Sequence, residues 1–165
     1  MNLKMIFPAI VSVSILLFPF TKLSAQTEDQ IPAFKMLMTN GRFFQAADLQ
    51  KNKPVVLIYF APDCEHCQML MNEFFKNIEA FKSVQVVLVT FKPLPELLPF
   101  EKLYEINKYQ NIKLGTEGNT YFLRKFFKLD VTPFTALYDR GGKLIYSYRK
   151  ETNVMDLINR MRQLQ

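Results

Sequence analysis

Two short, mostly apolar stretches stand out in the hydrophobic pattern of the chain, at residues 55–60 and 84–90. Both are rich in β-branched side chains, and both are shorter than an ordinary helix. A strand of a parallel sheet that is covered on both faces has such a continuous apolar pattern, instead of the alternation of a half-exposed strand. The pattern therefore predicts two buried, neighbouring strands at the centre of a sheet.

Elsewhere the apolar residues recur every three or four positions, which is the spacing of an amphipathic helix. In the clearest case, near the C-terminus, Val154, Leu157 and Ile158 fall on one face. Asp63 is the predicted N-cap of an earlier helix, which would place Cys64 in its first turn. The segments predicted to be helical are 46–51, 64–81, 101–109, 119–128 and 154–164.

Turn signals predict two antiparallel hairpins, one at each end of this region. Asn40-Gly41 separates apolar segments and favours a two-residue type I′ turn, because both residues of that turn have positive φ. A second hairpin is predicted at 134–148, around Gly141-Gly142. Strands alternate with helices and the chain closes on a hairpin and a helix. The predicted fold is α/β, with a central mixed β-sheet flanked by helices and an N-terminal β-hairpin extension.

The first 25 residues have a different character from the rest of the chain. Lys4 precedes a mostly apolar stretch at 5–20, and Ala25 is a small residue at the end, which is the order of a secretory signal peptide. The alternative is a membrane anchor through 5–20, although a span needs about 20 apolar residues and prolines interrupt this one. We expect cleavage, a lead-in at 26–32 and one domain at 33–165, exported to the periplasm.

Composition and charge narrow the function further. The 165 residues are 49% hydrophobic and 22% charged, as in an ordinary globular domain that folds without disulfide staples. The net charge is +6, of which Lys4 and Lys22 contribute two within the predicted signal peptide. Basic residues do not cluster with aromatic ones, so nucleic-acid binding is not expected. We also expect the protein to be a monomer.

The two cysteines of the chain, Cys64 and Cys67, form a Cys-x-x-Cys motif between a buried strand and a helix. A thiolate attacks disulfides, and a helix N-terminus stabilises a thiolate through its unpaired N–H groups and partial positive charge. Cys67 lies one turn further on, close enough to form a disulfide with Cys64. We predict that Cys64 is the nucleophile and that Cys67 resolves the mixed disulfide.

The segment from Leu57 to Cys67 resembles the active-site segment of thioredoxin-like proteins, and residues 131–139 with Gly141-Gly142 resemble their cis-proline segment and closing hairpin. With the Asn40-Gly41 hairpin, residues 33–163 are similar to the exported TlpA/ResA-like branch, often grouped with the AhpC/TSA redoxins. The resemblance implies that Thr132–Pro133 is cis, faces the disulfide and binds the substrate strand.

This resemblance also implies the partners of the reaction. They would be thiols or disulfides of exported proteins, together with a membrane electron donor or acceptor, and no cofactor is expected. The chain departs from the family at two positions. Thioredoxins have a buried acid at the position of Ile58, which helps deprotonate the resolving cysteine, and ResA-like proteins have Glu at the position of Leu70. Cys67 must therefore use another base or a water.

Charged side chains around the motif are predicted to tune its redox potential. His66 matches the histidine of the oxidising Cys-Pro-His-Cys proteins such as DsbA, and a protonated imidazole favours the Cys64 thiolate. Asp63, which replaces the Trp of thioredoxins, and Glu65 oppose it, because a like charge disfavours a thiolate. We expect partial cancellation, and the direction of electron flow, reductase or oxidase, stays open.

Other functions fit the residues less well. A peroxiredoxin has Thr where this chain has Ala61, and covalent haem attachment needs His where it has Gln68. Cys64, His66 and Cys67 supply three zinc ligands at most, without the second pair of a structural site, so no metal is expected. The alternative outside enzymology is a redox-inert binding module that uses the proline-rich stretch at 93–99 as a contact surface.

Overall fold

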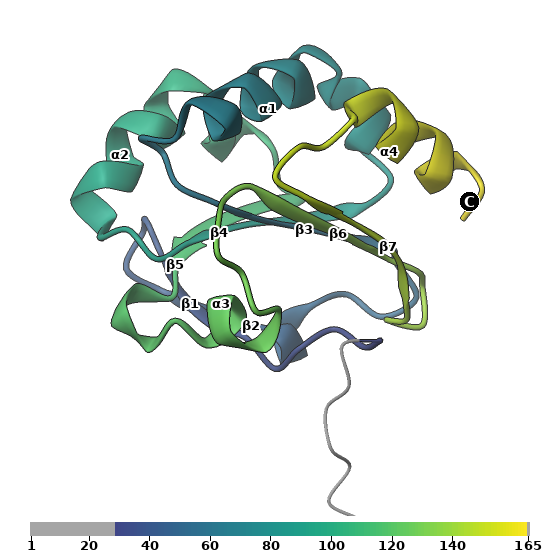
Figure 1. Cartoon of the computed structure of the whole chain (residues 1–165), viewed down its shortest axis with the longest axis horizontal. Coiled ribbons are helices and arrows are strands. Elements are labelled where there is room, and N and C mark those ends of the chain that lie inside the picture. Colours follow the sequence, from purple (N-terminus) through teal and green to yellow (C-terminus); the bar gives the residue numbers. More distant parts are fainter. Residues whose placement is uncertain (1–28, 165) are drawn as a thin grey trace, which may run out of the picture.

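A seven-stranded mixed β-sheet in the order β2-β1-β5-β4-β3-β6-β7 organises the protein (Figure 1). The computed structural model describes residues 29–164, so the predicted signal peptide and the first part of the lead-in lie outside the described residues. Within residues 29–164, no helix has the length and hydrophobicity that crossing a membrane requires.

The elements follow one another in the order that the sequence predicts, with additions. The strands are β1 (Lys35–Met38), β2 (Phe43–Gln45), β3 (Val55–Phe60), β4 (Gln85–Thr90), β5 (Ile112–Thr116), β6 (Phe134–Tyr138) and β7 (Leu144–Arg149). The helices are α1 (Glu65–Lys76), α2 (Leu94–Leu103), α3 (Phe122–Phe126) and α4 (Val154–Arg162), with 3₁₀ turns at Ala46–Asp48, Ile78–Phe81, Ile106–Lys108 and Gly118–Thr120.

The two predicted central strands, β3 and β4, are paired in parallel, and every residue of both is buried. β4 also pairs in parallel with β5, whereas β3 pairs antiparallel with β6, which makes the sheet mixed. Helices α1, α2 and α4 cover one face of the sheet and α3 covers the other (Figure 1). The predicted fold class is therefore confirmed.

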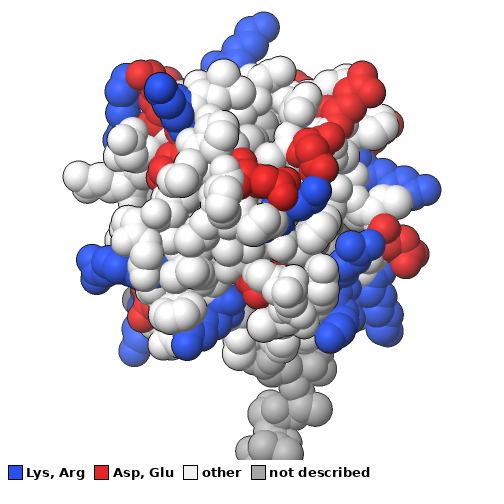
Figure 2. Space-filling model, turned by 90° about the vertical axis from the view of Figure 1, so that its left-hand side faces the viewer, with Lys and Arg blue, Asp and Glu red and all other residues white. Residues whose placement is uncertain are grey.

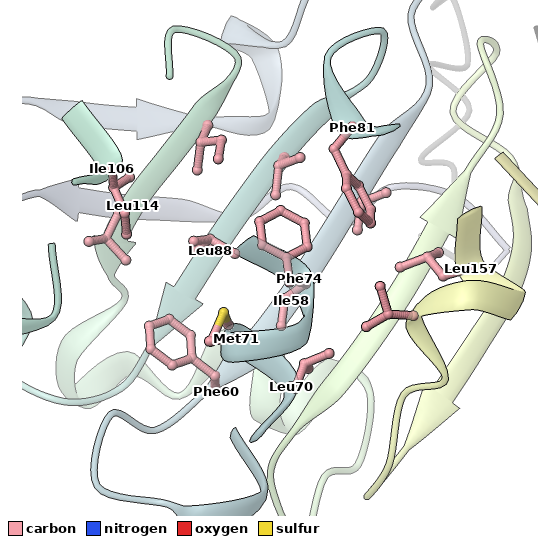
Figure 3. Packing of buried hydrophobic residues seen from close by; sticks show 14 of the residues in the cluster. Ile58, Phe60, Leu70, Met71, Phe74, Phe81, Leu88, Ile106, Leu114 and Leu157 are labelled. Carbon is pink, nitrogen blue, oxygen red and sulfur yellow. The ribbon is translucent and has the colours of Figure 1, made fainter. Parts of the chain in front are cut away.

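Side chains of β3 alternate between two hydrophobic cores, because successive residues of a strand point to opposite faces. Ile58 and Phe60 contribute to the α1-face core, which packs under α1, α2 and α4 (Figure 3). Leu57 and Tyr59 contribute to the α3-face core, together with Leu123 of α3. The sheet thus has a covered surface on each side, which explains the uninterrupted apolar pattern of its central strands.

The predicted N-terminal hairpin is present as β1 and β2, but its turn differs from the prediction. Gly41 has φ of 79°, and Asn40 is not among the residues with positive φ, so the turn is not type I′. The Met38 N–H bonds to the Arg42 carbonyl and the Gly41 N–H to the Met38 carbonyl, which closes a three-residue loop. Such loops have a type I turn followed by one left-handed residue, a position that glycine occupies without strain.

Two further elements differ from the sequence prediction. Helix α2 covers Leu94–Leu103, whereas the sequence predicted a helix at 101–109, whose second half contains only the 3₁₀ turn Ile106–Lys108. The helix tolerates Pro95 in its first turn, because the N–H that a proline lacks would have no helical partner there. The strand β5 was not predicted, since Lys113 and Gly115 interrupt its apolar pattern. Gly115 is required by packing, because a Cβ at this position would lie 2.8 Å from the Leu37 carbonyl oxygen.

The predicted helix at 119–128 is reduced to a 3₁₀ turn followed by the short α3, because Tyr121 between them has a left-handed backbone with φ of 48°. The short helix predicted at 46–51 is likewise only a 3₁₀ turn. The C-terminal helix follows its prediction closely, and Val154, Leu157 and Ile158 are buried in the α1-face core. These differences leave the predicted order of strand, Cys-x-x-Cys motif and helix unchanged.

Candidate active site

Cys64 lies at the junction between the end of β3 and the start of α1. It is the N-cap residue of α1, its N–H bonds to the Ala61 carbonyl at 3.1 Å, and its carbonyl accepts the N–H of Gln68 at 3.0 Å. The predicted N-cap role of Asp63 is therefore wrong, because the Asp63 carboxylate binds the Lys92 ammonium instead. Cys64 still lies where the unpaired N–H groups of the helix meet solvent.

The two cysteines of the motif are free thiols in this structure and differ sharply in accessibility. Cys64 is partly exposed, whereas Cys67 is only 1% exposed. The Cys67 sulfur accepts a hydrogen bond from the Ala61 N–H at 3.5 Å, and the Cys64 thiol donates to the Thr132 carbonyl at 3.6 Å. A substrate can therefore reach Cys64 but not Cys67.

These surroundings shift the two thiol pKa values in opposite directions. Burial alone would raise the pKa of Cys64, but hydrogen bonds from the Cys67 backbone N–H, from the Thr132 side chain and from the Cys67 thiol outweigh it and lower this pKa. Burial raises the pKa of Cys67 to about 12. Cys64 is thus the better thiolate at neutral pH, while Cys67 keeps its proton.

The segment around Pro133 faces the cysteines, as the resemblance implied. The Thr132–Pro133 peptide bond is cis, and the Thr132 carbonyl lies against the Cys64 sulfur. Pro133 is buried, while Val131 just before it is 48% exposed. An exposed residue therefore directly precedes the segment that contacts the reactive sulfur.

The three predicted tuning residues, Asp63, Glu65 and His66, are all exposed. The His66 backbone N–H is among the hydrogen bonds that lower the pKa of Cys64, whereas its imidazole stands in solvent. The Asp63 carboxylate lies 2.6 Å from the Lys92 ammonium, and this hydrogen bond is the main cause that lowers its pKa. Asp63 is therefore not the uncompensated negative charge that the sequence suggested.

Apolar side chains fill the space where thioredoxins have a buried acid. Ile58 and Leu70 are buried in the α1-face core with Cys67, and Figure 3 shows Ile58 and Leu70 packed with Met71 and Phe74. The one buried acid within residues 29–164 is Glu117. The α1 face under Cys67 thus provides no buried carboxylate.

Glu117, which the sequence analysis missed, belongs to the opposite face of the sheet. It is 6% exposed; one carboxylate oxygen accepts the Tyr59 hydroxyl and the other the Leu123 N–H, each at 2.8 Å. Burial and this hydrogen bond raise the pKa of Tyr59 far above its ordinary value. No signal in the sequence distinguishes Glu117 from an exposed acid, because the strand that precedes it was not predicted.

The surface beside the site is only weakly charged. A groove of about 490 Å³ begins at Pro62 and Asp63 and runs between α1 and α2. Figure 2 shows a face of the molecule on which Lys and Arg are interspersed with Asp and Glu and most of the surface is uncharged. Across residues 29–164, no three His, Cys, Asp or Glu side chains come together to hold a metal ion.

A helix-terminal Cys-x-x-Cys pair facing a cis-proline segment on a mixed sheet defines the thioredoxin-like class of thiol–disulfide oxidoreductases. The chain belongs to the AhpC/TSA family, whose model matches residues 27–161. It is thus a redox enzyme of the thioredoxin-like superfamily. No curated protein sequence matches the chain significantly.

Solved structures with the same fold include proteins of several redox classes. A secreted disulfide oxidoreductase from Mycobacterium tuberculosis, homologous to E. coli DsbE, is 18% identical with a TM-score of 0.67, over 80% of this chain and 96% of that one. A peroxiredoxin-like protein from Aquifex aeolicus is 16% identical with a TM-score of 0.69, and the match covers 83% of this chain and 86% of that one. An exposed lipoprotein thioredoxin from Streptococcus pneumoniae is 18% identical with a TM-score of 0.62, over 81% and 100%.

Proposed function

We propose that the protein is an exported enzyme that exchanges disulfides with protein substrates through Cys64-Glu65-His66-Cys67. The observation that carries this proposal is the asymmetry of the two cysteines. One sulfur is accessible and hydrogen-bonded so that its thiolate is favoured, while the other is buried with a pKa of about 12. A structural disulfide does not require its two cysteines to differ in accessibility and pKa, whereas a nucleophile and a resolving thiol do.

The first step is the attack of the Cys64 thiolate on one sulfur of a substrate disulfide. A bond forms between Cys64 and that sulfur, the substrate S–S bond breaks, and the second substrate sulfur leaves as a thiolate that takes up a proton. The product is a mixed disulfide held at the N-terminus of α1. In the reverse direction, the N–H groups that favour the Cys64 thiolate make Cys64 a good leaving group when a second substrate thiolate attacks the mixed disulfide.

In the second step, the Cys67 sulfur attacks Cys64, which releases the first substrate sulfur as a thiolate and forms the Cys64–Cys67 disulfide. The substrate has then gained two electrons, and the enzyme has lost them. Because no buried acid lies on the Cys67 face within residues 29–164, the Cys67 proton passes to a water or to the departing substrate thiolate. The same steps in reverse oxidise a substrate dithiol.

Thr132 and Pro133 form the proposed substrate-binding edge. Val131 is exposed and directly precedes Thr132, whose carbonyl lies against Cys64, and we propose that an extended substrate strand pairs with the backbone of this segment. Such pairing would place a substrate disulfide against the Cys64 sulfur without selecting a particular side chain. This arrangement suits an enzyme with several exported protein substrates.

Export, a periplasmic location and a membrane electron donor or acceptor are part of the proposal. They are supported by the order of basic, apolar and small residues at the N-terminus, and by the likeness of the fold to proteins described as secreted or exposed. We expect a monomer. The potential of the pair is expected between about −270 mV, the value of thioredoxin, and about −120 mV, the value of DsbA.

The proposal is tested by the reduction of a model protein disulfide with the expected mature protein, residues 26–165. Cys64→Ser is expected to abolish turnover, whereas Cys67→Ser is expected to accumulate the mixed disulfide, which mass spectrometry detects. The double variant controls for reaction at other residues. Full activity in Cys64→Ser would contradict the proposal and favour a redox-inert binding module.

A further inference from the structure

Lys92 is a charged residue near the cysteine motif that the sequence analysis did not single out. Its ammonium lies 2.6 Å from the Asp63 carboxylate and 3.5 Å from the Glu96 carboxylate. The Lys92 side chain is only 22% exposed, and its ammonium lies 5.7 Å from the centre of the Phe91 ring. This lysine is therefore held in place by two carboxylates and an aromatic face.

The sheet explains why residues far apart in sequence meet here. β3 and β4 are parallel, and their last residues, Phe60 and Thr90, are paired directly. The segments that follow the two strands therefore leave the sheet at the same edge, and the Lys92 N–H bonds to the Thr90 hydroxyl at 3.2 Å. Lys92 thus reaches across to the residue immediately before Cys64.

The charged groups of the motif segment and of the Lys92 ion pairs form an unequal set. The carboxylates belong to Asp63, Glu65 and Glu96, whereas the cationic side chains are Lys92 and, when protonated, His66. Lys92 binds two of the three carboxylates. Without Lys92, the carboxylate adjacent to the nucleophile would be unbalanced, and a negative charge there opposes the formation of a thiolate.

We propose that Lys92 is a positioning residue for Cys64, which holds the Asp63 carboxylate, neutralises the charge beside the nucleophile and fixes the turn from β3 into α1. The proposal rests on the proposed function, because it concerns the nucleophile of that reaction. It assigns Asp63 and Lys92 to one unit, so that the effect of either residue depends on the presence of the other.

The test measures the equilibrium constant of the Cys64–Cys67 disulfide against glutathione at pH 7. Lys92→Met leaves Asp63 unbalanced, so the reduced form loses stability and the disulfide becomes about two- to fivefold harder to reduce. Asp63→Asn leaves Lys92 as an excess cation, so the disulfide becomes easier to reduce, by a smaller factor because Glu96 still binds Lys92. The double variant returns to within about twofold of the parent protein.

Two control variants separate charge from folding. Lys92→Arg keeps the cation and is expected to leave the equilibrium constant nearly unchanged. Lys82→Met breaks the exposed ion pair between Lys82 and Glu79, beyond the far end of α1, and is expected to have no effect. The thiolate absorbance of Cys64 in a Cys67→Ser background gives a second reading of the same change.

Single variants that shift the constant in the same direction, or a double variant that stays well outside twofold of the parent protein, would overturn the inference, because Lys92 would then be only structural. An unchanged constant in Lys92→Met would overturn it as well. A parent protein that forms no Cys64–Cys67 disulfide in glutathione would overturn the proposed function, and this inference with it. The two failures are therefore distinguishable.

Discussion

Ile58 and Tyr59 are consecutive residues of β3, and they face two different kinds of interior. Ile58 points into the α1-face core, which holds Cys67 and no buried acid within the part of the chain that the structure describes. Tyr59 points into the α3-face core, where its hydroxyl donates to the buried carboxylate of Glu117. One face of the sheet is apolar beneath the reactive sulfur, and the other contains a satisfied polar pair.

This difference shows that the face on which an acid is buried matters as much as its presence. Moving by one residue along a strand moves a side chain to the opposite side of the sheet. The Glu117 carboxylate is close to β3 but belongs to the side away from Cys67, where it accepts the Leu123 N–H and fixes the start of α3. Its role is structural, and Cys67 keeps a raised pKa.

The largest expected effect comes from placing an acid on the apolar face. Ile58→Asp is expected to lower the free energy of unfolding by about 3–5 kcal/mol at pH 7, because it buries an unpaired charge. Burial raises the pKa of the new carboxyl in the folded state, so the loss should shrink as the pH falls toward 4. Urea denaturation at several pH values measures this dependence.

Ile58→Asn is the matched control for this prediction, since it has nearly the same size as Asp but does not ionise. Its loss of stability is expected to be independent of pH between 4 and 7. If Ile58→Asp and Ile58→Asn show the same pH profile, the α1-face core is more hydrated than its packing indicates.

A smaller effect is expected on the α3 face. Glu117→Ala leaves the Tyr59 hydroxyl and the Leu123 N–H without their acceptor, which should cost about 1–3 kcal/mol of unfolding free energy. The redox potential of the cysteines should stay unchanged, because the carboxylate lies across the sheet from Cys67. A changed potential in a folded Glu117→Ala protein would show that the two faces are coupled.

The two thiols should contribute to stability with opposite dependence on pH. In Cys64→Ser only the Cys67 thiol remains, and its pKa is raised in the folded state. The free energy of unfolding should therefore fall as the pH rises above the ordinary thiol pKa of about 8.5, by at most about 1.4 kcal/mol per pH unit. In Cys67→Ser only Cys64 remains; its folded pKa is lowered, so stability rises as the pH passes from that pKa toward 8.5.

Denaturant titrations between pH 7 and 9 measure both slopes, below the range in which Tyr59 would ionise in the unfolded chain. The double Cys→Ser variant provides the baseline. Slopes of the same sign in the two single variants would contradict the assignment of opposite pKa shifts.

The smallest effects are expected from the exposed side chains of the motif. His66→Ala removes a potential cation, so the disulfide should become harder to reduce, whereas Glu65→Ala should make the pair more oxidising. Because both side chains are exposed and screened, each shift should be about 30 mV or less.

Titration of both variants against glutathione at two pH values tests these signs. If both substitutions move the potential in the same direction, local side-chain charge does not set it. The packing of Thr132 against Cys64 would then be the main determinant.

Local sequence predicted the parts of the site that depend on neighbouring residues. The strand at 55–60, the cysteines after it and the closing hairpin each have a local pattern, and the cis bond before Pro133 followed from the family resemblance. What failed depends on contacts between distant residues. Asp63 was predicted to cap α1, but its carboxylate binds Lys92 instead. The strand β5 forms despite its poor apolar pattern, because it pairs with both β1 and β4.

The division of roles between Cys64 and Cys67 is tested most directly by the alkylation rate of each thiol in the reduced protein as a function of pH. Brief exposure to iodoacetamide followed by mass spectrometry of the peptides distinguishes the two. Cys64 should react at pH 7 with a midpoint below that of a free thiol, about 8.5, while Cys67 stays unmodified up to at least pH 9. Equal rates at the two cysteines, or faster reaction at Cys67, would contradict the proposed mechanism.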